Sequence, residues 1–191
     1  MHYCIRILTK EFPTDKVIER ILMPYYWDNI PEEEDRDKDF VFPAFTWDWW
    51  QVGGRYNGAL KLKYNWNTDE DKYRWMFYEK TPRAGRLFRS RLLEDILEMS
   101  KYSYHSEEEY FLSMGGRDDY LYVDGAYVDD LINFEEECDA CFGFIDLDGK
   151  AYVRSYWNGE HFIDNENFDN QVREICKDRK GCYVVVVDVH D

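Results

Sequence analysis

The sequence lacks any apolar run close to the roughly 18 residues that a membrane-spanning helix needs. Residues 1–8 enter a strand-like alternation directly, without the pattern of a signal peptide. The five cysteines are an odd number, which argues against a secreted disulfide framework. We therefore expect a protein of the cytosol, with reduced thiols and without a membrane partner.

Several catalytic signatures are also missing. The chain has no G-x-S-x-G elbow, no P-loop and no dinucleotide-binding fingerprint. It has no long internal repeat, although the triplet Gly-Gly-Arg occurs at 53–55 and 115–117. The sequence therefore predicts no cofactor, and it leaves open whether the protein is an enzyme.

Basic residues are scarce relative to acidic ones. Lysine and arginine number 24 against 40 aspartates and glutamates, for a net charge of −16. Residues 72–91 carry seven bases and one acid, whereas residues 107–139 carry one base and twelve acids. Because phosphates are repelled by such a charge, direct binding of nucleic acid is disfavoured and a basic protein partner is favoured.

The remaining composition is that of a folded domain. The chain has 191 residues, of which 45% are hydrophobic and 18% aromatic. This length and composition fit one domain over residues 1–191 that buries its own core. Residues 28–39, with seven acids and two bases, lack apolar periodicity and predict an acidic loop.

Strand and helix patterns alternate along the chain. Apolar alternation predicts strands at residues 2–8, 47–52 and 120–123, and hairpins joining 59–66 to 72–77 and 142–145 to 151–153. Helical spacing predicts a helix after Pro13, helices at about 87–100, 107–112 and 128–132, and one at 166–180 capped by Gly181. The final run, 182–189, is apolar on both faces and predicts a central strand. We expect an α+β fold: a mixed, largely antiparallel sheet with two or three helices packed on one face.

Residues 46–60 combine three tryptophans with a glycine pair and an arginine. Trp47 and Trp49 are expected on one side of a strand that Gly53-Gly54 ends, since glycine accepts positive φ. Arg55 then follows beside bare backbone N–H groups, a geometry suited to a phosphate or carboxylate. The candidate ligand-binding residues are Trp49, Gly53, Gly54 and Arg55. A tight turn with Arg55 in an ordinary ion pair is the alternative.

Asp188 and His190 share a face at the end of the predicted central strand. A carboxylate beside an imidazole suits general base chemistry or metal binding. The alternative is a frayed terminus with a surface histidine.

Four cysteines are weak candidates for a zinc site: Cys138, Cys141, Cys176 and Cys182. Their second pair is more widely spaced than is typical for zinc, so buried apolar cysteines are the alternative. The segment Asp146-x-Asp148-Gly149 resembles the start of a calcium loop, but Trp157 stands at the twelfth position, so a hairpin turn is favoured.

The acidic window offers a surface for a partner. Its candidate contact residues are Glu107, Glu108, Glu109, Asp118, Asp119, Asp129 and Asp130. Such a row of carboxylates is able to imitate nucleic-acid phosphates, and a solvated acidic surface is the alternative.

Three segments together resemble a group of uncharacterised proteins encoded largely by phages and prophages. These segments are Trp47–Arg55 with Tyr56-x-Gly58, residues 144–149, and the closing Val187-Asp188-Val189-His190. In that group the last motif resembles Asp-Cys-His, whereas Val189 replaces the cysteine here. The resemblance implies a phage setting, in which small acidic proteins often antagonise host defences.

Two functions follow as hypotheses. The first is a non-enzymatic inhibitor in the host cytosol, of anti-CRISPR or anti-restriction type, which occupies the basic nucleic-acid-binding surface of a defence protein. The second is a nucleotide-like ligand-binding or hydrolytic enzyme that uses Arg55, Asp188 and His190. A protein that forms a homo-oligomer through its aromatic surface is a further alternative.

Overall fold

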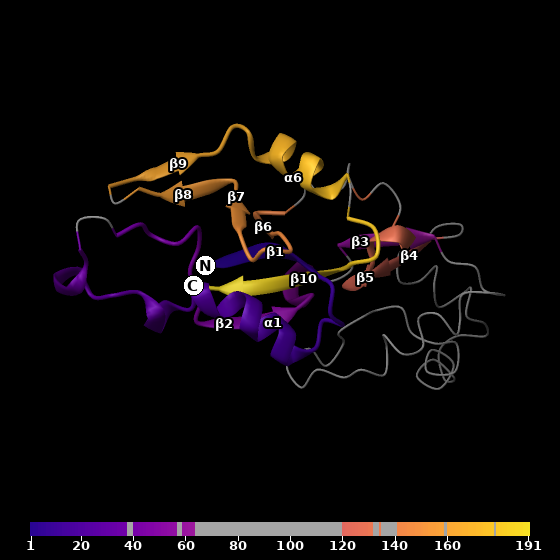
Figure 1. Ribbon diagram of the computed structural model, residues 1–191, viewed down its shortest axis with the longest axis horizontal. Coiled ribbons are helices and arrows are strands. Elements are labelled where there is room, and N and C mark those ends of the chain that lie inside the picture. The colour runs from indigo at the N-terminus through magenta and orange to yellow at the C-terminus, as the bar shows by residue number, and fades with distance from the viewer. Residues whose placement is uncertain are drawn as a thin grey trace.

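A six-stranded sheet forms the centre of the protein (Figure 1). The computed structural model describes residues 1–37, 40–56, 59–63, 120–131, 134, 141–158, 160–177 and 179–191. The strands of this sheet are β1 (His2–Thr9), β2 (Trp49–Val52), β5 (Gly125–Tyr127), β6 (Gly143–Ile145), β7 (Ala151–Val153) and β10 (Tyr183–His190). They follow the order β2-β10-β1-β6-β7, and β5 also pairs with β10.

The strand β10 is the centre of this sheet, as its apolar run predicts. It pairs antiparallel with β1 along its whole length, from His2 opposite His190 to Thr9 opposite Tyr183. Its other edge is shared by β2 and β5. The pairing of β1 with β6 is parallel, and the other described pairings in this sheet are antiparallel. The predicted α+β class with a mixed, largely antiparallel sheet is confirmed.

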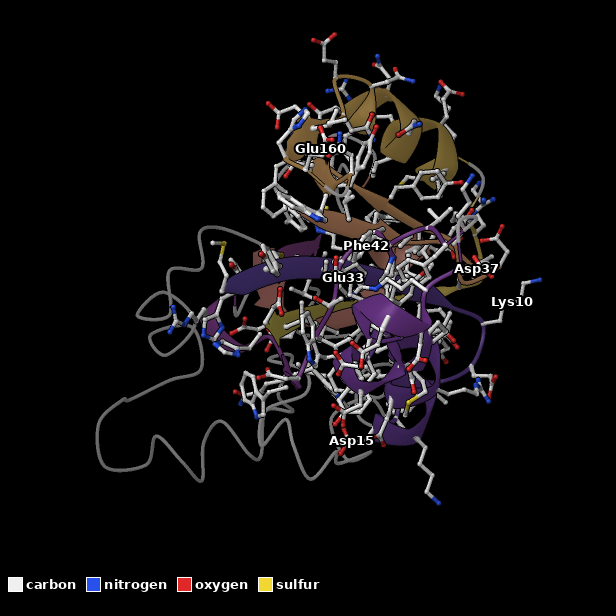
Figure 2. All side chains as sticks on the ribbon, turned by 90° about the vertical axis from the view of Figure 1, so that its left-hand side faces the viewer. Lys10, Asp15, Glu33, Asp37, Phe42 and Glu160 are labelled. Carbon is white, nitrogen blue, oxygen red and sulfur yellow. The ribbon has the colours of Figure 1, made fainter. Side chains whose placement is uncertain are left out.

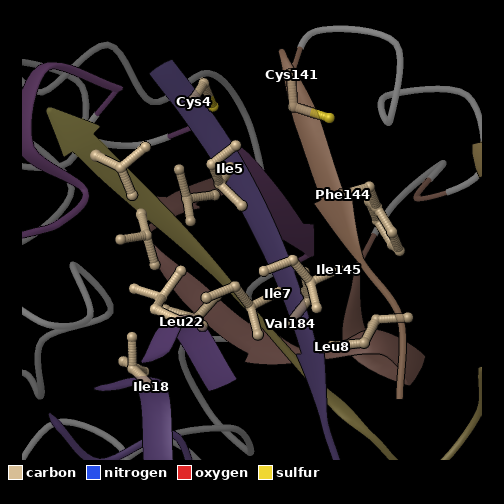
Figure 3. Close-up of a cluster of buried hydrophobic side chains, with 14 of the residues drawn as sticks. Cys4, Ile5, Ile7, Leu8, Ile18, Leu22, Cys141, Phe144, Ile145 and Val184 are labelled. Carbon is tan, nitrogen blue, oxygen red and sulfur yellow. The ribbon is translucent and has the colours of Figure 1, made fainter. Parts of the chain in front are cut away.

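Two α-helices of the described residues pack against this framework. α1 (Asp15–Leu22) buries Val17, Ile18 and Leu22, and Figure 3 shows its Ile18 and Leu22 beside Ile7. α6 (Phe168–Cys176) lies near β7 on the opposite side of the picture from α1 (Figure 1) and buries an apolar stripe of its own. The prediction that Gly181 caps this helix was wrong, because α6 ends at Cys176 and Gly181 lies in the turn that leads into β10.

Within the described ranges, two small sheets lie outside the central one. β3 (Leu60–Lys63) pairs antiparallel with β4 (Tyr120–Val123), and β8 (Ser155–Trp157) pairs with β9 (Phe162–Asp164), a hairpin that the sequence analysis did not predict. The proposed partner of β3 at 72–77, and the helices expected at 87–100 and 107–112, lie outside the described residues.

The chain after β4 runs differently from the prediction. It bends at Asp124 and continues directly as β5, so the strand predicted at 120–123 is followed at once by a second strand. The short helix expected at 128–132 is the 3-10 turn η5 (Val128–Asp130). The predicted hairpin of β6 and β7 is confirmed, with Gly149 at a φ of 80° in its turn.

The two faces of the central strands differ in chemistry. Residues directly opposite each other in an antiparallel pair lie on the same face, so the pairing of β1 with β10 sorts their side chains. One face is aliphatic and fully buried, with Ile5, Ile7, Val185, Val187 and Val189 all 0% exposed. The other face, which we call the polar face, carries His2, Cys4, Arg6, Asp188 and His190. Polar groups on a buried face of a central sheet require partners.

The acidic loop lies at the surface. It contains the 3-10 turns η2 (Trp27–Asn29) and η3 (Glu33–Asp35), which follow α1 and the turn η1 (Met23–Tyr25). Figure 2 looks at the side of the molecule that carries this loop and shows Glu33 and Asp37 at its surface. None of the helices in the described part of the chain combines the length and apolar character that crossing a bilayer requires.

Candidate functional site

The ends of three strands bring two histidines together. His190 on β10 lies opposite His2 on β1 and opposite Trp49 on β2. The imidazole rings of His2 and His190 meet edge to face, with centroids 4.8 Å apart and an interplanar angle of 68°. The two chain ends also lie at this corner of the sheet, where the Met1 amino group donates to the Asp191 carbonyl (Figure 1).

His2 pairs with a buried carboxylate. Its Nδ1 lies 2.8 Å from Oδ1 of Asp188, whose side chain is 2% exposed. The second oxygen of Asp188 accepts the backbone N–H of Arg55 at 3.0 Å. The expectation of bare N–H groups at this turn was therefore wrong for the Arg55 N–H, because the protein's own Asp188 occupies the position proposed for a ligand anion.

The glycine pair allows this close approach. Gly53 and Gly54 follow β2 with φ angles of 68° and 52°, as predicted, and the turn η4 (Gly54–Tyr56) begins at the second of them. A Cβ atom on Gly54 would lie 2.5 Å from the Asp188 Cβ, and one on Gly53 would lie 2.6 Å from Oδ2 of Asp124. Asp124 and Asp188 are each 1% exposed as whole residues. The glycines are thus needed for their conformation and for the space they leave to two buried acids.

His190 forms a second pair, with a different acid. Its Nδ1 lies 2.9 Å from Oδ1 of Asp48, and both side chains are exposed to solvent, at 41% and 58%. The hydrogen bond from His190 is the largest cause that holds the pKa of Asp48 below its usual range. Asp188 and His190 do share the polar face, but each is paired elsewhere. The alternative of a frayed terminus fails, because His190 belongs to β10.

The carboxylates fix the tautomer of both neutral rings. An ionised carboxylate only accepts hydrogen bonds, so Nδ1 of His2 and of His190 carries the proton and Nε2 of each ring is left for a ligand. One pair is buried and held by the Arg55 N–H, whereas the other is exposed. Two imidazoles in contact, with different surroundings, are suited to act as a base and an acid on one ligand.

Aromatic side chains border the two histidines. Trp49 is 42% exposed, and its ring lies edge-on to His2 with centroids 6.3 Å apart. Trp47 is 3% exposed, so the prediction that these two tryptophans share a side was wrong; β2 begins only at Trp49. The Tyr56 hydroxyl donates to the His2 carbonyl at 3.0 Å and fixes the start of β1.

The Arg55 side chain is exposed. No ion pair of Arg55 occurs among the residues that the structure describes, so the alternative of an ordinary ion pair finds no support there. Its guanidinium is therefore available to an anion at this corner.

Three residues of this site were missed by the sequence analysis: His2, Asp48 and Asp124. His2 lies in a strand pattern, and Asp48 stands between two tryptophans. Only the pairing of distant strands brings them to His190, and no local spacing signals that pairing. The closing Asp188-x-His190 motif was the signal for this corner of the sheet.

The candidate zinc ligands that the structure describes do not assemble. Cys141, Cys176 and Cys182 are buried thiols outside any disulfide, and Cys138 lies outside the described residues. Over the described ranges, no three His, Cys, Asp or Glu side chains are placed to hold a metal ion. Burial raises the pKa of Cys4, on the polar face, to about 11, so this thiol is protonated at neutral pH and is a poor nucleophile.

Most of the acidic partner-binding candidates fall where the structure gives no description. These are Glu107, Glu108, Glu109, Asp118 and Asp119. Asp129 lies in η5, where its Oδ2 accepts the Gly181 N–H at 2.6 Å and so joins η5 to the turn before β10. Asp130 ends the same turn.

Comparison with known proteins identifies no relative: no family model, curated protein or solved structure matches this chain. The resemblance to phage-encoded proteins therefore stays a prediction. Two of its three segments, Trp47–Arg55 and 187–190, meet at the corner formed by β2 and β10.

Proposed function

We propose that this protein binds a small nucleotide-like phosphodiester at the corner formed by His2, His190 and Trp49, and hydrolyses it by acid–base catalysis. One observation carries the proposal: two imidazoles 4.8 Å apart, each with its Nδ1 on a carboxylate. This pairing fixes the tautomer of both rings and presents two Nε2 atoms to one ligand.

The two histidines have distinct roles in the proposed reaction. His2, held by the buried Asp188, takes a proton from a water molecule as the water oxygen attacks phosphorus. The bond from phosphorus to the leaving oxygen breaks. His190 begins this step as the imidazolium, with a proton on both ring nitrogens, and gives its Nε2 proton to that oxygen. The products are a phosphomonoester and an alcohol, and the proton that His2 takes up is later returned to His190 through solvent. The exposed Arg55 guanidinium and Trp49 indole supply contacts for phosphate and for a flat base.

The charge of the protein favours a small ligand over a polymer. At a net charge of −16, each further phosphate of a long nucleic acid adds repulsion. A ligand with one or two phosphoryl groups is repelled less by the net charge of the protein, so local contacts are enough to bind it. This is the enzyme hypothesis of the sequence analysis, with His2 added as the base.

The variants His2→Gln and His190→Gln are expected to lose activity on bis(p-nitrophenyl) phosphate by about 100-fold or more, the usual contribution of a general acid or base. His161→Gln is the matched control, since His161 is exposed in the turn between β8 and β9 and takes no part in the site. Release of nitrophenolate, with circular dichroism to verify folding, measures the effect. Equal activity of all three variants would refute the proposal.

A second candidate function rests on the acidic loop. Glu32, Glu33, Glu34 and Asp35 are consecutive and all exposed, and Trp27, earlier in the same stretch of chain, is 56% exposed. Exposed carboxylates and an exposed aromatic side chain suit a basic protein surface, as the inhibitor hypothesis requires.

Neutralising these four acids, as E32Q, E33Q, E34Q and D35N together, is expected to abolish capture of a basic host protein in low salt. The wild-type complex should dissociate as salt rises, because exposed charges are screened. Pull-down from host lysate at two salt concentrations, with mass spectrometry of the eluate, measures this. Capture that resists both salt and neutralisation would rule out this use of the loop.

A further inference from the structure

Arg6 is a buried arginine on the polar face of the sheet. It lies two residues beyond Cys4 on β1, opposite Val186 of β10 and beside Phe144 of β6. Its burial matches that of the aliphatic core, at 1% exposure. Ile5 and Ile7, its neighbours in sequence, point to the opposite face, so Arg6 shares its face with Asp188 and His2.

The guanidinium of Arg6 has unfilled hydrogen-bond donors. Both Nε and Nη1 are buried, and among the residues that the structure describes neither has a partner. An arginine stays charged in proteins, so it cannot avoid the cost of burial by losing a proton. A buried charge without hydrogen bonds is strongly unfavourable, and such groups in native proteins ordinarily have a partner.

The nearby carboxylates are already engaged. Asp188 accepts from His2 and from the Arg55 N–H, and Asp124 lies against Gly53 across β10 from Arg6. Burial is the main cause that raises the pKa of the Cys4 thiol; the charge of Arg6 opposes this rise and that of Asp188 adds to it, so both charges act on this stretch of the face. No carboxylate that the structure describes therefore completes the hydrogen bonding of Arg6.

The planar fork of a guanidinium matches the oxygens of a phosphate or carboxylate. We propose that Arg6 binds a second anionic group of the ligand, a phosphate, while the reacting ester lies at His2 and His190. The inference rests on the proposed function only for the ester at His2 and His190, and phosphate binding by Arg6 is argued independently. His2 and Arg6 are four residues apart on one strand, roughly 13 Å along it. The substrate class is thus a phosphodiester with a further phosphoryl group, such as a phosphorylated dinucleotide.

The test is thermal unfolding of the Arg6→Met variant with and without inorganic phosphate at millimolar concentration. Without phosphate, we expect the variant to melt higher than the wild type by about 3 °C or more, since an apolar side chain of similar length replaces an unsatisfied buried charge. Phosphate should raise the melting temperature of the wild type by clearly more than that of Arg6→Met, which keeps only the contacts at the histidine corner. Arg20→Met, at an exposed arginine of α1, is the control and should keep the response to phosphate.

Two results would overturn the inference. One is a lower melting temperature, or loss of folding, of Arg6→Met without phosphate, because the guanidinium would then be satisfied within the protein. The other is equal stabilisation of both proteins by phosphate. Arg6→Lys, which keeps the charge without the fork, should bind phosphate about tenfold more weakly than the wild type, and equal binding would also count against the inference. None of these measurements uses hydrolysis, so the proposed function can fail while Arg6 still binds phosphate, and the reverse.

Discussion

The Asp188→Ala variant is expected to lose about 3 kcal/mol of unfolding free energy, because two donors lose their acceptor in a buried place. Nδ1 of His2 and the Arg55 N–H both donate to this carboxylate, which is 2% exposed. Each such unsatisfied donor costs roughly 1–3 kcal/mol. For a chain of this size the loss corresponds to a fall of about 10 °C in melting temperature. Urea denaturation followed by tryptophan fluorescence measures it.

Asp48→Ala is the matched control. It removes the partner of the other histidine, but Asp48 and His190 are both exposed, so water replaces the lost contact. We expect little change in melting temperature. If Asp48→Ala destabilises the protein as much as Asp188→Ala does, burial does not make the His2–Asp188 pair more important for stability than the His190–Asp48 pair.

The second large effect is expected from Gly54→Ala. The alanine would adopt a φ of 52°, which costs about 1–2 kcal/mol for a residue with a side chain. Its Cβ would also lie 2.5 Å from both Cβ and Oδ2 of Asp188, so the turn or the strand has to move. Together these terms give a loss of about 3 kcal/mol or more. Displacement of Asp188 should also reduce activity through His2.

Gly149→Ala separates the two causes. Gly149 has a φ of 80° in the turn between β6 and β7, and a Cβ there would have nothing within 4 Å. Only the conformational cost remains, about 1–2 kcal/mol. Denaturation of both variants under one set of conditions gives the comparison. If Gly54→Ala loses no more unfolding free energy than Gly149→Ala, the close approach to Asp188 contributes nothing to the loss.

The sequence predicted the framework of the site from local patterns. The unbroken valine run at 184–187 predicted a strand buried on both faces, and β10 is that strand. The glycine pair predicted a turn with positive φ at the end of β2. These features depend on neighbours in the chain, so periodicity and residue type are enough to find them.

The partners within the site depend on strand register instead. His2 meets Asp188 because β1 and β10 pair antiparallel with His2 opposite His190, and a shift of one residue would send these side chains to opposite faces. The same reason explains why Arg55 was assigned to a ligand: the sequence gives no sign that Asp188 fills the turn. Arg6 was overlooked because its strand pattern is indistinguishable from that of a half-exposed edge strand.

The measurement that tests the central claim most directly is a double-mutant cycle on hydrolysis of bis(p-nitrophenyl) phosphate, with wild type, His2→Gln, His190→Gln and the double variant. A base and an acid that act in one step are not additive, so the double variant should lose little more than either single variant. Turnover by the wild type with this pattern would support a shared acid–base site at the His2–His190 contact. No turnover by the wild type, or losses that multiply independently, would contradict it.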